Sequence, residues 1–426
     1  RTYIKETLNI NSMSMDAPKI ASEILLKDYC AQTKYNPNVV RKWSFTRNTI
    51  PLKDVLVGFD PFFQLDIFKN LFEEMRNTND KFSKEFLFSY KNTNIVLTYG
   101  VGGLHSVNEN EKYESNEKEL VMTSDVASLY PNLIINYKCI RFVEVLLKYA
   151  NVKTERLIAK HSGEKQKDTL FKLILNAISG LLDSQYSWLY FPEGALRMRL
   201  IGQLILTKFI EVCAMKGWKV VSANTDGIEV VIPKEDRELY IQTLDEATKL
   251  FNLDLEHKAY DFIYYMNVNN YLAKTDDGDL KKTGIFKTKP PLGDSVDMLI
   301  ISKALEAFYV KHIDFSEYIR NPDKYDNHIY DYCKSNKIGK DFVVWWNGQI
   351  QQQLNRYYFS KKGAYLFKQK HGQGTMQHIN VGQPVTLYNN HQQQSWEEYN
   401  INYNYYISAT QKIIDEIANF NQLKLF

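Results

Sequence analysis

The chain has 426 residues and a mass of 49.9 kDa, which is too long for one small hydrophobic core, so two or three compact units are expected. With 44% hydrophobic and 14% aromatic residues, it is too apolar to be an intrinsically disordered chain. The net charge of +3 is uninformative by itself, but the charged residues are unevenly distributed along the sequence.

No apolar run approaches the roughly 20 residues that a membrane-spanning helix needs, and the first residues, RTYIKETLNI, do not resemble a signal peptide. A cytoplasmic protein without membrane partners is therefore expected. The four cysteines form no C-x-x-C pair, and the eight histidines lack metal-ligand spacing. These patterns indicate neither a zinc site nor a disulfide framework, so any metal must be held by carboxylates.

The first 93 residues show helical periodicity near APKIASEILLKDYC and carry no catalytic signature. The segment NIVLTYGVGGLHS at 94–106 predicts a strand that runs into a glycine-rich turn. ELVMTSDV at 119–126 then predicts a short buried strand with Asp125 at its exit, followed by Ser-Leu-Tyr-Pro. An aspartate here can simply begin a turn, with Pro131 fixing φ, so this stretch alone does not decide between a turn and a functional carboxylate.

Apolar residues recur at helical spacing at about 142–160 and 165–182, and SGE at 162–164 separates the two runs. This pattern predicts a helical hairpin. Lys172 and Asn176 lie four residues apart and therefore share a helix face, and Arg156 and Lys160 have the same spacing. If the helices pack antiparallel, three cations converge on one polyanion, although ordinary surface lysines give the same pattern.

VVSANTDGIEVVI at 220–232 predicts a β-hairpin with Asp226 at its tip, where a turn-forming aspartate is the simpler interpretation. Together with Asp125 it indicates more, because two carboxylates on neighbouring strand ends repel each other and a divalent cation between them relieves the repulsion. Mg²⁺ suits such a site because it takes one or two carboxylates and completes its octahedron with phosphate oxygens and water.

Basic and aromatic residues alternate in the last third of the chain, where no Asp or Glu occurs from Phe342 to Trp396. This composition suits a phosphate backbone with sugars and bases beside it, and a solvated strand-rich surface is the alternative. A second basic cluster, LKKTGIFKTKP at 280–290, favours nucleic acid.

The order of these motifs resembles that of family B DNA polymerases. DVASLYPN, KLILNAISG and ANTDG are similar to the family's motifs A, B and C, which read approximately D-x-x-S-L-Y-P-S, K-x-x-x-N-S-x-Y-G and Y-G-D-T-D-S. YGVGGLHS resembles the Tyr-x-Gly-Gly segment before motif A, and NNYLAKTDDGDLKKTGIFK resembles the segment that leads to the thumb. NRYYFSKKGAYLFKQ and GQPVTLYNN are similar to the C-terminal regions of phage-type members. The resemblance covers roughly residues 90–426.

The resemblance implies an α+β right hand with an antiparallel-sheet palm, helical-hairpin fingers and a mixed thumb. The expected divisions are an N-terminal region at 1–93, a first palm segment with motif A at 94–140, fingers with motif B at 141–182, a second palm segment with motif C at 183–289, and the thumb at 290–426. The implied activity is template-directed extension of a primer 3′-hydroxyl with dNTPs, in the replication of phage or mobile-element DNA.

The family's site residues carry over at the matching positions. Asp125 and Asp226, with the backbone of Val126, are implied to hold two Mg²⁺ ions, for which Mn²⁺ can substitute. The nucleotide is implied to contact Ser128, Leu129, Tyr130, Arg156, Lys160, Lys172 and Asn176, with Tyr130 excluding a 2′-hydroxyl. The basic clusters and the resemblance together assign contacts with primer-template DNA to Gly102, Gly103, Thr225, Lys281, Lys282, Arg356, Lys361, Lys362 and Lys368.

The chain departs from the family pattern at several positions. Asn224 replaces the first aspartate of motif C, Ala177 and Ser179 replace a Ser and a Tyr of motif B, and Gly227 replaces the last Ser of motif C. These changes put fidelity in doubt more than activity. The 3′-5′ exonuclease motifs are absent from residues 1–93, so an exonuclease domain is expected to be missing, to lie outside this sequence or to belong to a separate replication subunit. Motifs A and B begin only about 47 residues apart, at Asp125 and Lys172, which leaves no room for the large insertion that protein-primed members of the family place between them. A nucleic-acid primer is therefore the simpler expectation. A weakened, polymerase-like DNA-binding or scaffold protein is the alternative.

Overall fold

The computed structural model describes residues 4–6, 9–289, 297–380 and 382–423. It divides into two compact units, which comprise residues 1–107 with 114–261 and residues 108–113 with 262–426. Each unit has a hydrophobic core of its own. The expected five-part division into palm, fingers and thumb stays a prediction, and its boundary at 290 lies outside the described residues.

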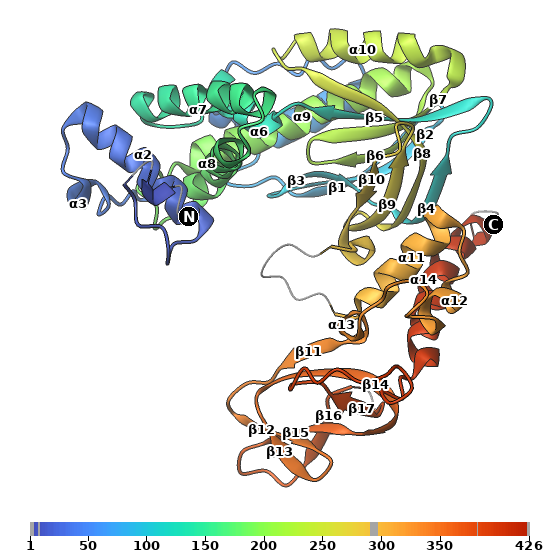
Figure 1. The fold of residues 1–426 in the computed structure, drawn as a ribbon. Coiled ribbons are helices and arrows are strands. Elements are labelled where there is room, and N and C mark those ends of the chain that lie inside the picture. Colours follow the sequence, from blue (N-terminus) through green and yellow to red (C-terminus); the bar gives the residue numbers. More distant parts are fainter. Residues whose placement is uncertain (1–3, 7–8, 290–296, 381, 424–426) are drawn as a thin grey trace. The chain divides into compact units, whose positions relative to one another are not determined.

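Unit 1 contains a wholly antiparallel sheet (Figure 1), in the order β1-β2-β3-β6-β7-β5-β8. Its strands are β1 (Lys84–Tyr90), β2 (Thr93–Gly100), β3 (Gly103–Ser106), β5 (Glu119–Val126), β6 (Lys219–Asn224), β7 (Gly227–Pro233) and the first half of β8 (Leu255–Asn267). The predicted strand at 119–126 and the predicted hairpin around Asp226 are therefore confirmed.

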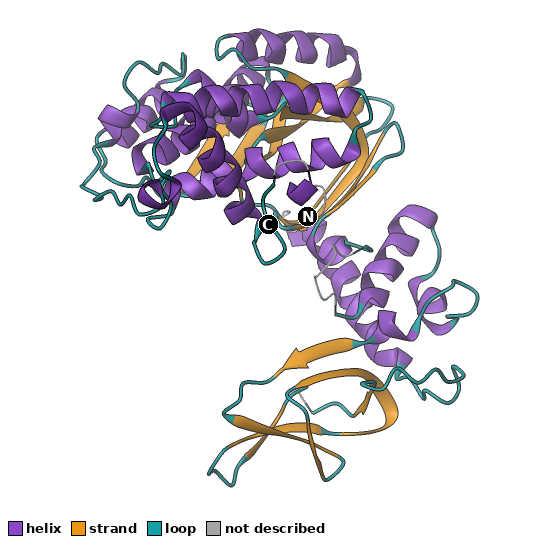
Figure 2. Ribbon diagram, turned by 60° about the vertical axis from the view of Figure 1, so that its left-hand side comes forward, coloured by secondary structure: helices purple, strands orange, loops and turns teal. Residues whose placement is uncertain are grey.

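Helices cover one face of this sheet, as Figure 2 shows. The long helix α9 (Pro192–Lys216) packs against β3, β6 and β7, and α10 (Arg237–Lys249), which follows the short turn η1 (Lys234–Asp236), lies beside α9. Most of α9 is buried, because apolar residues occur on all sides of it. The remaining short helices of unit 1 are α3 (Pro37–Val40), α4 (Leu52–Val55), α5 (Asp66–Arg76) and α6 (Leu129–Asn136).

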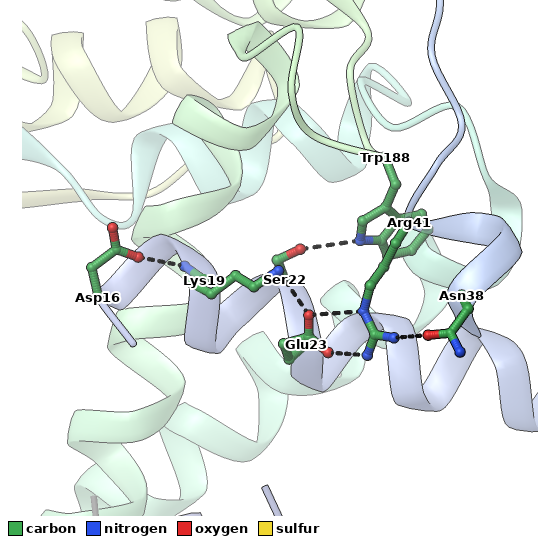
Figure 3. Close-up of polar contacts among 7 residues, drawn as sticks. All are labelled: Asp16, Lys19, Ser22, Glu23, Asn38, Arg41 and Trp188. Carbon is green, nitrogen blue, oxygen red and sulfur yellow. Dashed lines mark hydrogen bonds and ion pairs between the residues drawn. The ribbon is translucent and has the colours of Figure 1, made fainter. Parts of the chain in front are cut away.

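The predicted helical hairpin is present as α7 (Val143–His161) and α8 (Lys165–Asp183). The N-terminal helix α2 (Ala17–Thr33) packs against both α7 and α8, so the three helices form one group. Polar contacts fix α2 in place (Figure 3): Ser22 Oγ accepts a hydrogen bond from Trp188 Nε1 at 3.1 Å, and Arg41 binds both carboxylate oxygens of Glu23. The Arg41 guanidinium thereby lowers the pKa of Glu23.

Unit 2 combines strands and helices. The second half of β8 pairs with β4 (Glu109–Glu114) and β9 (Asn270–Thr275), and β9 pairs with β10 (Leu280–Lys282), which the turn η2 (Gly284–Phe286) follows. Four helices come next in the described chain, α11 (Leu299–Lys311), α12 (Phe315–Arg320), α13 (Ile329–Tyr332) and, near the C-terminus, α14 (Tyr403–Leu423).

Two small antiparallel sheets lie between α13 and α14 in the sequence of unit 2. One has the order β11-β14-β17 and the other the order β13-β12-β15-β16. Their strands are β11 (Lys334–Lys337), β12 (Phe342–Trp346), β13 (Gln349–Gln351), β14 (Leu354–Ala364), β15 (Leu366–Lys370), β16 (Met376–His378) and β17 (Val385–Leu387). The expected mixture of helices and strands in this region of the chain is confirmed.

Candidate active site

The two predicted carboxylates come together because β5 and β7 are neighbours. Asp125 lies opposite Gly227 in the register, and Val126 N donates a hydrogen bond of 2.7 Å to the carbonyl oxygen of Asp226. A Cβ atom on Gly227 would stand 2.1 Å from Asp125 Oδ1, so the carboxylate of Asp125 occupies the space that a side chain would fill. Glycine at 227 therefore allows the two acidic residues to lie side by side.

The turn that presents Asp226 is strained. Thr225 adopts φ of +57°, a left-handed conformation that is unfavourable for a β-branched residue. Its backbone N–H donates to Leu104 O at 2.9 Å, and its hydroxyl donates to Asn224 Oδ1 at 3.2 Å. The surrounding chain thus holds a costly turn conformation, which favours a functional role for the tip over an ordinary hairpin turn.

His105 is a residue of this site that the sequence interpretation missed. It lies opposite Asn224 in the β3–β6 register, and its Nδ1 is 2.8 Å from Asn224 Oδ1. The oxygen of Asn224 is therefore occupied by His105 and Thr225, which gives a physical reason for an amide at this position. No local signal in the sequence pairs residues 105 and 224, because that contact depends on strand register.

The strand of Asp125 is followed by a turn at Ala127 and Ser128, as the simpler interpretation expects, and the chain then forms a helix. Ser128 has φ of +53° and directly precedes α6, which begins at Leu129. Pro131 lies in the first turn of this helix, where a backbone N–H has no intrahelical acceptor and its absence costs nothing. The N-terminus of α6 thus points free backbone N–H groups away from the helix beside the acidic pair.

Tyr130 is held between two glycine-containing segments. Its hydroxyl lies 3.4 Å from Gly102 O, and a Cβ on Gly103 would be 3.5 Å from that hydroxyl. On another side, a Cβ on Gly202 of α9 would lie 3.9 Å from the Tyr130 ring. Burial raises the pKa of Tyr130 and the charge of Asp226 raises it further, while Arg199 opposes them, so the phenol is protonated at neutral pH.

A cavity of about 300 Å³ connects these residues with the helical hairpin. It is lined by Ser128, Leu129, Tyr130, Pro131, Arg156, Leu175, Asn176, Ser179 and Asp226. The structure therefore brings together residues of α6, α7, α8 and the β6–β7 turn that are far apart in sequence. Six of these nine are predicted site residues, whereas Pro131, Leu175 and Ser179 were not predicted to contact the nucleotide.

The predicted cations of the hairpin do not all reach this cavity. Arg156 lines it and is also paired with Asp168, with Nε 3.1 Å from Oδ1. Lys160 and Lys172 are exposed on α7 and α8 and are not among the lining residues. Arg199 on α9, which the sequence interpretation missed, is near enough for its charge to lower the pKa of Tyr130, and it pairs with Asp183 at 3.2 Å.

The strand that carries Asp125 is fixed from its opposite face. Buried Ser124 lies 2.7 Å from both Tyr240 Oη and His257 Nδ1, and His257 Nε2 is 3.1 Å from Asp245. This Ser-His-Asp arrangement has the order of a hydrolase triad, but Ser124 is 0% exposed, so no substrate can reach its hydroxyl. The network instead stabilises the position of β5.

The donor set suits Mg²⁺ better than zinc. In the described residues of the chain, no group of three or more His, Cys, Asp or Glu side chains is arranged to hold a metal ion. The pair Asp125 and Asp226 supplies the one or two carboxylates that Mg²⁺ ordinarily takes from a protein when phosphate oxygens and water complete its coordination. A metal at this position would therefore depend on a bound substrate for the rest of its ligands.

The predicted DNA contacts have varied surroundings. Gly102 and Gly103 lie near the Tyr130 hydroxyl, and Thr225 lies near Gly103. Lys281 and Lys282 belong to β10, and Lys282 is paired with Glu306 at 2.5 Å. Arg356 lies over the ring of Tyr330 and Lys368 over that of Phe342, and Lys361 and Lys362 are exposed. Their contact with DNA stays a prediction, and the ion pair makes Lys282 less suited to bind a phosphate.

Comparisons with known proteins found similarities to DNA polymerases. No protein-family model matches the chain. A region of 202 residues is 25% identical to DNA polymerase 1 of Sulfurisphaera ohwakuensis, and this match covers 43% of the chain and 22% of that polymerase. The family B DNA polymerase from the hyperthermophilic archaeon Pyrobaculum calidifontis matches in structure with a TM-score of 0.43 and 14% identity, over 83% of this chain and 50% of that one. The chain is thus similar in sequence to a DNA polymerase. The matched region spans about a fifth of that polymerase's length.

No helix among the described residues combines the length and the apolar character that crossing a membrane requires.

Proposed function

We propose that the chain is a template-directed DNA polymerase of the family B type, which extends a primer 3′-hydroxyl with dNTPs. The observation that carries the proposal is the juxtaposition of Asp125 and Asp226 beside a cavity that Tyr130, Arg156 and Asn176 also line. The sequence similarity to DNA polymerase 1 supports the same reaction. The phage or mobile-element context belongs to this proposal, as do the primer-template partner and a separate or additional exonuclease.

The proposed reaction is attack of the primer 3′-oxygen on the α-phosphorus of the dNTP, with departure of pyrophosphate. Two Mg²⁺ ions held by Asp125, Asp226 and the backbone of Val126 would activate the attacking hydroxyl and stabilise the leaving group, and Mn²⁺ can take their place. The residues of the chain then have to bind the triphosphate, position the sugar and keep the carboxylates fixed.

The start of α6 is suited to the triphosphate. Its free backbone N–H groups, near Ser128 and Leu129, and the positive end of the helix dipole attract anions beside the carboxylate pair. Arg156 lines the same cavity and supplies a positive charge, and Asn176 offers an amide that can orient a phosphate or base. Lys160 and Lys172 would contribute if the hairpin moves toward the nucleotide on binding.

Tyr130 is positioned to select deoxyribose. The hydrogen bond from its hydroxyl to Gly102 O fixes the ring on the side of the cavity, where an extra 2′-hydroxyl on the sugar would meet it. A fixed ring would discriminate against ribonucleotides because it collides with their 2′-hydroxyl, whereas a flexible side chain would move aside.

A primer-extension assay tests this function. The purified chain, a DNA primer-template with a labelled primer, four dNTPs and Mg²⁺ should give elongated products, and omission of the template should give none. A protein that only binds DNA, which is the alternative function, would shift the labelled DNA in a binding assay but leave its primer length unchanged. That outcome, with the chain folded, would overturn the proposal.

A further inference from the structure

The sheet β13-β12-β15-β16 of unit 2, whose strands are labelled in Figure 1, has two faces. The residues on these two faces differ in chemistry. Residues directly opposite one another in an antiparallel register point to the same face, and neighbours along a strand alternate. Val344 lies opposite Lys368, and Trp346 lies opposite Leu366. Because Val344 and Leu366 are buried in the core of unit 2 and Trp346 packs against that core, this face is the inner one.

The outer face carries a row of rings that crosses three strands. Trp345 of β12 lies opposite Phe367 of β15, which lies opposite His378 of β16, and Ile350 of β13 is on the other side of Trp345. Tyr365 and Met376 flank this row. We call the set Trp345, Ile350, Tyr365, Phe367, Met376 and His378 the aromatic platform.

The platform is unusually apolar for an accessible surface. Ile350 is 64% exposed, Tyr365 47% and Met376 45%, while Trp345 and Phe367 are half-buried. None of the six belongs to the hydrophobic core that the described residues of unit 2 form, whereas Val344 and Leu366, their neighbours along β12 and β15, do. A cluster of exposed large apolar side chains on one sheet face is typical of a binding surface.

The rings are held in defined orientations. Trp345 Nε1 donates a hydrogen bond of 3.0 Å to Gln369 Oε1, which fixes the indole plane. The centroids of Phe367 and His378 are 4.4 Å apart, and those of Tyr365 and His378 are 5.4 Å apart. Rigid, preorganised rings lose little conformational entropy when a ligand stacks on them.

The charge around the platform favours a polyanion over a protein segment. No acidic residue occurs from Phe342 to Trp396, so no carboxylate of this stretch repels a phosphate. Lys368 and Lys370 alternate with Phe367 along β15 and therefore point to the inner face, where Lys368 lies over Phe342. The absence of acidic residues from this stretch leaves the outer face open to the phosphates of a nucleic acid while its bases contact the rings.

Single strands fit this surface better than a duplex does. In a duplex the flat faces of the bases are stacked on each other and are inaccessible, whereas unpaired bases can stack on aromatic side chains regardless of sequence. We propose that the aromatic platform binds single-stranded nucleic acid by base stacking, independently of the carboxylate pair on unit 1. The proposal does not require the chain to be a polymerase.

The test compares two ligands on the full chain, a labelled (dT)12 oligonucleotide and an abasic backbone of the same length, by fluorescence anisotropy at one salt concentration. The double variant Trp345→Ala with Phe367→Ala should bind (dT)12 at least about tenfold more weakly, because each stacked base contributes substantially. Its affinity for the abasic backbone should equal that of the wild type. The conservative double variant Trp345→Phe with Phe367→Tyr keeps both rings and should retain binding within about twofold.

A second measurement maps the site. A (dT)12 oligonucleotide containing 5-iododeoxyuridine, photo-crosslinked to the wild type, should label peptides that contain Trp345, Phe367 or His378. Equal (dT)12 affinity of wild type and alanine variant, equal losses for both ligands, or cross-links confined to other peptides would each overturn the proposal. Self-association that the alanine variant abolishes without a change in (dT)12 affinity would assign the platform to a second copy of the chain instead. An unchanged thermal midpoint checks that both variants are folded.

Discussion

Asp125, Asp226 and Asn224 lie within one short stretch of paired strands, but their surroundings differ. The oxygen of Asn224 accepts from Thr225 and lies 2.8 Å from His105, whereas Asp125 lies over Gly227 next to Asp226. The amide therefore helps to support the turn, and the two carboxylates lie side by side.

The first prediction separates these roles. Asp125→Ala and Asp226→Ala should each reduce primer extension by roughly 10³-fold or more, because metal-held charge supplies a large share of phosphoryl-transfer catalysis. Asn224→Ala is the matched control in the same turn and should cost far less. Single-turnover extension rates measure all three, and similar losses at Asn224 and Asp226 would show that the metal site is wrongly assigned.

The second prediction concerns the sugar. Tyr130→Ala should increase ribonucleotide incorporation relative to dNTP incorporation, while DNA affinity stays nearly unchanged, because the ring acts by excluding a hydroxyl. Tyr130→Phe keeps the ring and loses only the contact with Gly102 O, so it should discriminate as the wild type does. The ratio of kcat/KM for dNTP and rNTP is the measurement. Equal discrimination by the alanine variant and the wild type would refute the steric role.

At the scale of elements, α9 organises unit 1 through a buried ion pair. Lys208 and Glu211 are 4% and 0% exposed at their side chains, and their charged atoms are 2.6 Å apart. Glu211 Oε1 also accepts from the backbone N–H groups of Gln64 and Leu65, and Lys208 donates to Phe62 O. These contacts attach the segment before α5 to the helix that supports the sheet.

The third prediction follows from this burial. Lys208→Met should lower the free energy of unfolding by about 3–5 kcal/mol, because it leaves the carboxylate of Glu211 buried without its partner. Lys69→Met, which removes the solvent-exposed pair with Asp66, is the control and should cost less than about 1 kcal/mol. Denaturant unfolding of both variants gives the comparison. A loss at Lys208 no larger than that at Lys69 would mean that the pair does not anchor the segment.

At the scale of the whole molecule, the distribution of charge matters more than its sum. The net charge is +3, yet the stretch from Phe342 to Trp396 contains no acidic residue. Within it Lys361 and Lys362 are exposed, whereas Arg356 and Lys368 lie over aromatic rings. If this surface grips primer-template DNA, the two exposed lysines are the residues best placed to neutralise phosphates.

The fourth prediction is a change in salt dependence. The logarithm of the DNA association constant should fall by about 0.9 per log unit of salt for each phosphate contact, so Lys361→Ala with Lys362→Ala should flatten the slope by about two units. Products made per binding event should shorten, while single-nucleotide addition at saturating DNA should persist because the carboxylate pair is unchanged. Lys324→Ala, which removes a lysine already paired with Glu317, should leave the slope unaltered. Identical slopes for wild type and double variant would mean that this surface does not face DNA.

The sequence by itself determined the local elements of the protein. The strand at 119–126, the helices at 143–161 and 165–183 and the hairpin around Asp226 occur where hydrophobic periodicity and turn residues predict them. These signals depend on neighbours within a few residues, which a single sequence displays directly.

The tertiary structure decided which of these residues meet. The contact of His105 with Asn224, the position of Tyr130 between Gly102 and Gly202 and the outward row from Trp345 to His378 all depend on strand register or on packing between distant segments. A shift of register by one residue would turn each strand side chain to the opposite face without changing any local pattern. For that reason the sequence indicated the carboxylates, and only the folded chain showed what surrounds them.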